Sequence, residues 1–189
     1  MKNYKIIENN ITYDIIEYSN GTKAWYLNNK RHRENGPAAE YADGTKHWYK
    51  NGQPHRDDGP AVEYYNGDEC WYKNGIRHRD DGPAIESANG YKAWYKNGLC
   101  HKDNGPAVES ADGTKEWFKN GKRHRIDGPA IDVFNGTKEW YKNGKIHRSN
   151  GPAIELPNGD KEYWYNDKYL KYITTNEELK RYIKLLSIS

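Results

Sequence analysis

Histidines recur along the chain at a fixed interval, and their side chains could carry chemistry. Six of the seven histidines are spaced 23 residues apart, at His32, His55, His78, His101, His124 and His147. An imidazole commonly serves as a metal ligand or as a general base near neutral pH. A pair of residues that is often acidic follows at a constant distance, as Asp57-Asp58, Asp80-Asp81, Asp103-Asn104, Ile126-Asp127 and Ser149-Asn150. The spacing therefore suggests two kinds of site, a row of metal centres or a row of acid–base pairs.

The distance between units argues against a metal site. Two strands per unit, about 4.8 Å apart, would advance the chain by roughly 10 Å from one histidine to the next. Ligands that lie about 2 Å from one zinc ion sit within about 4 Å of one another. A separate metal in each unit would need acids in every unit, but Ile126 and Ser149 interrupt the acidic pattern. We therefore expect no metal, and we expect histidines that serve as structural hydrogen-bonding groups at a bend.

Carboxylates and cations also recur together and could be read as catalytic pairs, namely Glu63, Glu86 and Glu109 with Arg56, Arg79 and Lys102. An active site is normally a single place, whereas this pattern repeats in every unit. Cross-strand charge pairs, each contributing about 0.2–1 kcal/mol, explain such a repetition. The sequence has no nucleophile elbow, phosphate-binding loop or zinc motif. We expect a protein that is not an enzyme and needs no cofactor.

The 23-residue unit must position these side chains, and residues 113–135 represent it. An Asn-Gly pair such as Asn120-Gly121 favours a type I′ turn between antiparallel strands. A second turn signal, such as Asp112-Gly113, marks each boundary between units, so each unit should supply two strands. The Gly-Pro pair between them predicts a bend or bulge before the second strand, because proline cannot donate to a strand ladder. The units should form a long antiparallel meander.

Alternation along the strands assigns the columns of side chains to faces. In one unit it places Trp140 and Lys138 on one face, and Tyr141 and Glu139 on the other. In the second strand, a β-branched column that includes Val62 lies opposite an acidic column. The simplest assembly buries tryptophan against the β-branched column and leaves the tyrosines exposed. The predicted structural core is Trp25, Trp48, Trp71, Trp94, Trp117 and Trp140.

The ends of the array need protection against strand addition. Residues 1–20 are rich in isoleucine and predict an N-terminal capping hairpin, followed by six repeats over 21–158. Residues 159–189 predict a truncated seventh repeat and a C-terminal capping helix. Thr175 and Glu178 form a capping-box pair before an apolar stripe of Leu179, Tyr182, Ile183 and Leu186. The predicted fold is all-β: an elongated single-sheet antiparallel β-hairpin repeat, closed by one short helix, in one continuous domain.

Composition limits the classes of partner. The chain has 30 Lys and Arg against 27 Asp and Glu, a net charge of +3, so binding of nucleic acid is not indicated. No apolar run has the length of a membrane helix or a signal peptide. Cys70 and Cys100 occupy different places in their repeats and form no disulfide framework. A cytoplasmic protein is expected, and the sequence does not predict an oligomeric state.

The unit resembles the MORN repeat in its Glu-Trp-Tyr-Lys-Asn-Gly-Lys segment, the following His and the boundary Asp-Gly. The resemblance covers residues 21 to about 165 and is greatest to the Asn-Gly-Lys-x-His-Arg-x-Asp-Gly-Pro-Ala arrays of some bacteria, bacteriophages and giant viruses. His-Arg in place of His-Gly, and the added Asp-Gly-Pro-Ala, depart from the common MORN pattern. The resemblance implies an elongated single-sheet hairpin solenoid that serves as a platform for protein interaction, with phosphoinositide binding proposed for some members.

A binding surface is expected where the units differ, because a feature present in every unit is explained by folding. The middle units carry apolar residues after the central Asn-Gly, which predicts a contact region within residues 67–112. The candidate partner-binding residues are Tyr49, Tyr72, Tyr91, Tyr95, Phe118, Ile76 and Leu99. The leading hypothesis is a scaffold that binds a protein, a host factor in the host cytoplasm if the chain is viral or from a phage. The alternative is a module that binds a glycan, a small ligand or a lipid headgroup through exposed tyrosines.

Overall fold

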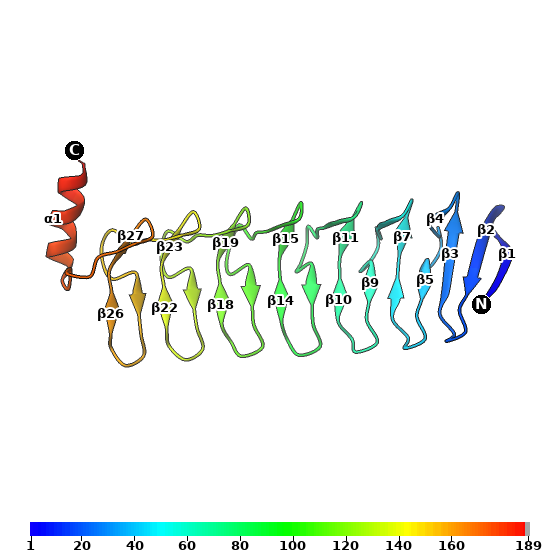
Figure 1. Ribbon diagram of the computed structural model, residues 1–189, viewed down its shortest axis with the longest axis horizontal. Coiled ribbons are helices and arrows are strands. Elements are labelled where there is room, and N and C mark those ends of the chain that lie inside the picture. Colours follow the sequence, from blue (N-terminus) through cyan, green and yellow to red (C-terminus); the bar gives the residue numbers. More distant parts are fainter. Residues whose placement is uncertain (188–189) are drawn as a thin grey trace. The chain divides into compact units, whose positions relative to one another are not determined.

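The computed structural model describes residues 1–187 and consists of antiparallel β-hairpins followed by one α-helix (Figure 1). This confirms the predicted all-β hairpin repeat with a short C-terminal helix. The chain divides into two compact units, Met1–Gly98 and Leu99–Ser189, which are described separately. No helix among the described residues is long and apolar enough to cross a membrane.

The N-terminal unit begins with the longest strands of the chain. Strand β1 (Lys2–Glu8) pairs antiparallel with β2 (Ile11–Glu17), and β2 pairs with β3 (Lys23–Leu27). Asn9 and Asn10 connect β1 to β2 with φ values of 48° and 64°, as a type I′ turn requires. Tyr13, Ile15, Trp25 and Ala38 form a buried cluster under this hairpin. The cluster is a compact core at the N-terminal end of the unit.

Short strands make up the rest of the N-terminal unit. They are β4 (Lys30–Arg31), β5 (Ala39–Glu40), β6 (Lys46–His47), β7 (Tyr49–Lys50), β8 (Gln53–Pro54), β9 (Val62–Glu63), β10 (Glu69–Cys70), β11 (Tyr72–Lys73), β12 (Ile76–Arg77), β13 (Ile85–Glu86), β14 (Lys92–Ala93) and β15 (Tyr95–Lys96). The main sheet of this unit follows the order β1-β2-β3-β5-β6-β9-β10-β13-β14, while β7 pairs with β8 and β11 pairs with β12 in small separate hairpins. The order is a meander, because each strand pairs with the next main-sheet strand along the chain.

The C-terminal unit repeats this arrangement and adds the helix. Its elements are β16 (Leu99–Cys100), β17 (Val108–Glu109), β18 (Lys115–Glu116), β19 (Phe118–Lys119), β20 (Lys122–Arg123), β21 (Ile131–Asp132), β22 (Lys138–Glu139), β23 (Tyr141–Lys142), β24 (Lys145–Ile146), β25 (Ile154–Glu155), β26 (Lys161–Glu162), β27 (Trp164–Tyr165), β28 (Lys168–Tyr169) and α1 (Asn176–Leu186). The main-sheet order is β17-β18-β21-β22-β25-β26.

Five tryptophans interrupt strands that the sequence predicts as continuous, namely Trp48, Trp71, Trp94, Trp117 and Trp140. In one repeat, Trp48 separates β6 in the main sheet from β7 in a small hairpin. The backbone N–H of Trp48 donates to the Ala61 carbonyl at 2.8 Å, and the backbone carbonyl of Trp48 accepts from the backbone N–H of His55 at 3.1 Å. The chain therefore leaves the main sheet at the tryptophan. One predicted strand becomes two strands that belong to different sheets.

The two predicted turns of each unit have different geometries. Asn51 and Gly52 both have positive φ, 52° and 83°, so the central turn is type I′. At the boundary, Gly67 has positive φ and donates to the Tyr64 carbonyl at 3.0 Å, while Asn66 keeps negative φ. The Asn66 carboxamide oxygen instead accepts from Asp68 N–H at 3.1 Å. The boundary is therefore a type I turn that ends in a left-handed glycine, stabilised by the asparagine side chain.

The structure contradicts the predicted packing of tryptophan against the β-branched column. Val62 lies opposite His47 in the sheet, and the His47 ring contacts Tyr49 with centroids 6.1 Å apart. The β-branched residues and the tyrosines therefore share one face, because neighbouring residues of a strand alternate between faces. Trp48 lies on the other face, where the Arg56 guanidinium stacks over its ring. The prediction was wrong because both alternating columns are aromatic, and alternation alone does not show which one meets the β-branched residues.

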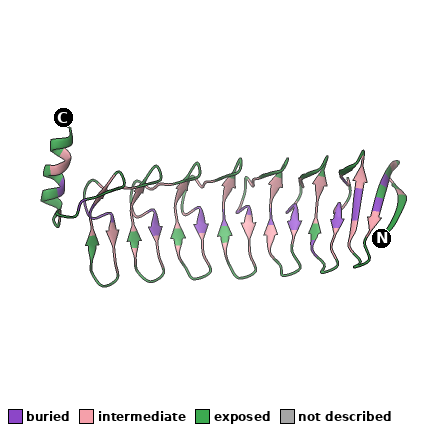
Figure 2. Cartoon of the chain, viewed as in Figure 1, coloured by how far each residue is buried: buried purple, intermediate pink, exposed green. Residues whose placement is uncertain are grey.

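Burial also differs from the sequence prediction (Figure 2). The most buried column is alanine, at 0% exposure in each of Ala38, Ala61, Ala84, Ala107, Ala130 and Ala153. Among the predicted core tryptophans only Trp25 is buried; the other five, Trp48, Trp71, Trp94, Trp117 and Trp140, are half-buried. The tyrosines that were predicted to be exposed are half-buried as well. The Arg77 guanidinium, for example, lies 5.4 Å from the centroid of the Tyr72 ring and 5.0 Å from that of the Tyr95 ring. Arginine side chains thus cover aromatic rings on both faces.

Helix α1 begins at the predicted capping box. The Thr175 hydroxyl accepts from Glu178 N–H, and the Glu178 carboxylate accepts from Thr175 N–H. Leu179 is buried in a cluster with Tyr163 and Leu170, and Tyr182 and Ile183 pack against that cluster. The helix therefore covers the end of the final hairpin of its unit with the predicted apolar stripe, apart from the exposed Leu186.

Candidate interaction site at the bends

The recurring histidine joins each bend to the turn of the next repeat. His78 Nδ1 accepts a hydrogen bond from Asn97 N–H at 3.0 Å, so the proton of the neutral ring lies on Nε2. His78 Nε2 donates to the Asp80 carboxylate, also at 3.0 Å. His32, His55 and His101 make the same two contacts. Both ring nitrogens of these histidines are engaged in holding the bend.

This arrangement leaves little chemistry to the imidazoles. A general base or a metal ligand needs a free lone pair, and the lone pair on Nδ1 of His78 already accepts from a backbone amide. Within residues 1–187, no group of three or more His, Cys, Asp and Glu side chains is placed to hold a metal ion. In these four bends the imidazoles serve as hydrogen-bonding links between the bend and the next turn.

In most repeats the residue after the histidine is an arginine. Its guanidinium stacks on the tryptophan of the same repeat. The Arg79 guanidinium lies 4.0 Å above the Trp71 ring and bonds the Asp81 carboxylate at 3.0 Å, the Pro83 carbonyl at 3.2 Å and the Glu86 carboxylate at 3.3 Å. A β-carbon at Gly82 would lie only 2.8 Å from the Arg79 Cζ atom. A side chain at position 82 would therefore require the Arg79 guanidinium to move from its place above the glycine.

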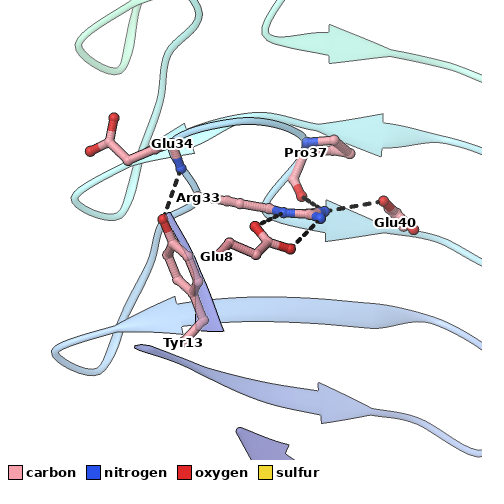
Figure 3. Close-up of polar contacts among 6 residues, drawn as sticks. All are labelled: Glu8, Tyr13, Arg33, Glu34, Pro37 and Glu40. Atoms are coloured by element: carbon pink, nitrogen blue, oxygen red, sulfur yellow. Dashed lines mark hydrogen bonds and ion pairs between the residues drawn. The ribbon is translucent and has the colours of Figure 1, made fainter. Parts of the chain in front are cut away.

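The first bend uses the equivalent arginine to hold the N-terminal hairpin (Figure 3). Arg33 donates from Nε and Nη2 to the two oxygens of the Glu8 carboxylate at 3.0 and 2.8 Å, and from Nη1 to the Pro37 carbonyl at 3.2 Å. Glu34 N–H donates to the Tyr13 hydroxyl at 3.2 Å. A bidentate arginine–carboxylate pair fixes orientation as well as distance. The end of β1 is thereby attached to the first repeat.

Within each of the two units, a groove lies between every two successive bends. In the N-terminal unit, one groove of about 440 Å³ is lined by Trp48, Tyr49, Lys50, Arg56 and Asp57, among others. The next, of about 340 Å³, is lined by the equivalent residues one repeat later and shares Arg56 and Asp57 with the first. In the C-terminal unit the two grooves measure about 610 and 590 Å³. Aromatic edges, cations and carboxylates therefore recur in a fixed order along each unit.

Two bends depart from this pattern, with Ser149 in the last bend and Ile126 in the bend before it. Ile126 stands where earlier bends carry Asp57, Asp80 or Asp103, and its side chain is 90% exposed. It lines both grooves of the C-terminal unit. The break in acidity at Ile126 is visible in the sequence, but it does not by itself mark a binding site. Its position at the rim of both grooves makes Ile126 a candidate contact residue.

The candidate residues chosen from the sequence lie apart from these grooves or only partly within them. Ile76 and Leu99 are 50% and 49% exposed on the small hairpins and belong to different units. Tyr91 and Tyr95 are half-buried. Tyr49, Tyr72 and Phe118 are half-buried too, and they line grooves beside the tryptophans on which arginine stacks.

Electrostatics on the tyrosine face is consistent with a structural role. Arg123 donates from Nε to the Glu116 carboxylate at 3.0 Å. Burial, together with a hydrogen bond to Glu139, raises the pKa of Tyr141 to about 12. Burial raises the pKa of the Cys100 thiol to about 11. A thiol with so high a pKa is a poor nucleophile at neutral pH, so this face offers no activated cysteine there.

Comparisons with known proteins assign no family. No model of a known protein family matches the chain, and a search of characterised protein sequences gives no match.

Proposed function

We propose that this protein is a non-catalytic repeat scaffold of the MORN-like type, and that it binds an extended segment of a partner protein in the grooves along its bends. The observation that carries the proposal is the recurrence of equivalent grooves in which consecutive members share lining residues. Grooves that follow one another at a regular spacing suit a ligand that is itself extended. The resemblance to MORN arrays implies the same class of function.

The charge of the grooves favours a polypeptide over a polyanion. Lys50, Arg56 and Asp57 line the same groove, and equivalent residues of both signs line the next one. The exposed carboxylates would repel nucleic acid or an anionic membrane surface, whereas a polypeptide can present charges of both signs.

The arginine side chains that stack on the aromatic rings favour a polypeptide ligand over a glycan. Sugar-binding sites use the open face of a tryptophan or tyrosine ring, but Arg79 occupies one face of Trp71 at 4.0 Å. Arg56, Arg125 and Arg148 cover the equivalent rings in other repeats. The ring edges and the polar groups between the bends remain available for contacts with a peptide.

Photo-crosslinking tests the proposal directly. A benzophenone amino acid placed at Lys73 or Lys142, which are exposed and line grooves, should crosslink to polypeptide in an extract of the source cells. The same group at Ser19, on an exposed boundary turn, is the matched control. Parallel binding assays use liposomes and immobilised glycans. Binding to lipid or glycan without a groove-specific protein crosslink would refute the proposal in favour of the alternative.

A further inference from the structure

The bends at His124 and His147 lack the carboxylate that four other bends contain, because Ile126 and Ser149 stand at its position. The His147 ring is held differently, since its Nδ1 lies 2.8 Å from the Asn166 carboxamide oxygen. Among the described bends, only the His124 bend combines the ring orientation of the complete bends with a missing acid.

His124 Nδ1 accepts from Asn143 N–H at 3.1 Å, so Nε2 carries the proton of the neutral ring, as in His78. At His32, His55, His78 and His101, Nε2 contacts the acid two residues later at 2.9–3.1 Å. At His124 that position is Ile126, and within residues 1–187 no carboxylate takes its place. One N–H donor of the bend is left to face a groove without its usual acceptor.

The grooves beside this donor are lined by fewer carboxylates than the equivalent grooves of the N-terminal unit, with the same number of Lys and Arg side chains. His124 lines both grooves of the C-terminal unit, with Lys119 and Arg125 in one and Lys142 in the other. Asp127 is already bonded to Arg125 at 3.1 Å. Compared with the Asp80-Asp81 bend, the Ile126-Asp127 bend has one negative charge fewer and one exposed apolar side chain more.

We propose that the bend formed by His124, Arg125 and Ile126 binds an acidic side chain of the partner. A partner Asp or Glu carboxylate accepts the His124 Nε2 hydrogen bond, and an adjoining apolar partner residue covers Ile126. The partner thus supplies from outside the group that Asp57, Asp80 and Asp103 supply from within. This inference rests on the proposed function and narrows it to one class of ligand, an extended acidic peptide with a neighbouring apolar residue.

Peptide selection tests the inference without knowledge of the natural partner. The full-length protein is immobilised and used to select from a random 12-residue peptide library. The selected peptides should carry Asp or Glu beside Leu, Ile or Val. Replacing that acid by its amide should weaken binding by about tenfold or more, as expected for one charge-assisted hydrogen bond.

Two substitutions in the protein make the test specific. Ile126→Asp restores the internal acid and should weaken the binding of the selected peptides by a similar factor of about ten. Its thermal unfolding should not fall below that of the wild type, because the other bends already contain this pair. Asp80→Ile removes an exposed acid from a bend of the N-terminal unit and should create a second site, raising the stoichiometry from one peptide to two.

The outcomes separate this inference from the proposed function. Selected peptides that bind wild type and Ile126→Asp equally, or that lack an enriched acid, would overturn the inference and leave the scaffold function standing. Failure to select any peptide would also overturn it, while groove-specific crosslinking decides the scaffold function independently. Acid-dependent binding that is lost in Ile126→Asp and gained in Asp80→Ile supports the assignment.

Discussion

Replacing His78 by alanine would remove the side chain that connects two successive repeats of the N-terminal unit. The imidazole accepts from Asn97 N–H through Nδ1 and donates to Asp80 through Nε2, each at 3.0 Å. Alanine makes neither contact, so the Asn97 amide becomes available to water. His78→Asn is the matched variant, because its carboxamide oxygen lies near the position of Nδ1 while nothing replaces Nε2.

The size of the effect follows from the two hydrogen bonds. A net hydrogen bond contributes roughly 0.5–1.5 kcal/mol, which corresponds to a roughly 2- to 12-fold change in an equilibrium constant. Hydrogen exchange at the Asn97 amide should accelerate by this factor in His78→Ala. The contact with Asp80 adds little, because that carboxylate is 76% exposed. The effect should remain local, since stability in a repeat array depends on contacts between neighbours.

Amide exchange measured by NMR resolves these positions. The Asn74 amide, which donates to His55 Nδ1 at 3.0 Å, is the internal control and should keep its wild-type rate in His78→Ala. His78→Asn should restore most of the protection at Asn97. Unchanged exchange at Asn97, or equal acceleration at Asn74 and Asn97, would refute the assignment of this bond to the link between repeats.

Three further predictions concern packing, turn geometry and thiol reactivity. Ile131 is 7% exposed, so Ile131→Ala should lower the free energy of unfolding by about 2–4 kcal/mol. Ile76→Ala, at an exposed position, should lower it by less than about 1 kcal/mol. Equal losses in denaturant titrations would contradict the assigned core. Asn120 has φ 51°, so Asn120→Val should cost about 1–2 kcal/mol in thermal unfolding, whereas Asn120→Gly should be close to neutral. Burial raises the pKa of Cys100 from 9.0 to about 11, so at pH 8 it should alkylate about 100-fold more slowly than in the unfolded chain. Because the folded pKa is the higher one, this thiol stabilises the fold below pH 9, and the contribution is lost as pH rises through about 11. Alkylation at the rate of the unfolded chain would show that the thiol is not buried.

The period and the turns could be predicted from the sequence because they depend on local conformation. Asn-Gly pairs such as Asn51-Gly52 adopt positive φ with little cost, so they mark a turn without knowledge of the rest of the fold. The capping box at Thr175 and Glu178 is equally local. These signals were sufficient for the hairpin repeat and its terminal helix.

The packing of the faces could not be predicted because it depends on contacts between distant residues. Trp48 and Tyr49 alternate, and both are large aromatic residues, so pattern alone did not choose between them. The deciding residue was Arg56, which stacks over Trp48 and bonds Glu63 at 2.7 Å. Its position beside the histidine and its recurrence with Gly-Pro were visible in the sequence. The sequence predicts this arginine as a cross-strand partner of glutamate and, with the histidine, as a brace of the bend, but it does not place the guanidinium over the tryptophan.

The candidate site illustrates a second limit. The differences between repeats point to Ile76 and Leu99, which lie on the small hairpins. The grooves appear only when successive bends are placed side by side, so the importance of Ile126 at their rim required the structure. The His124 donor likewise became evident only when the bonds of His78 defined what a complete bend contains.

The link from a histidine to the asparagine of the following repeat has a consequence for how such a gene changes over time. His55 bonds the Asn74 amide, and His78 bonds the Asn97 amide in the same way. An in-frame loss of residues 56–78 would bring Asn97 to His55 and re-form the same contact between different copies. Unequal recombination between repeats could therefore shorten or lengthen the coding sequence in steps of one unit without leaving a mismatched junction. Array length can then change by whole repeats while the re-formed junction keeps the same histidine–asparagine link.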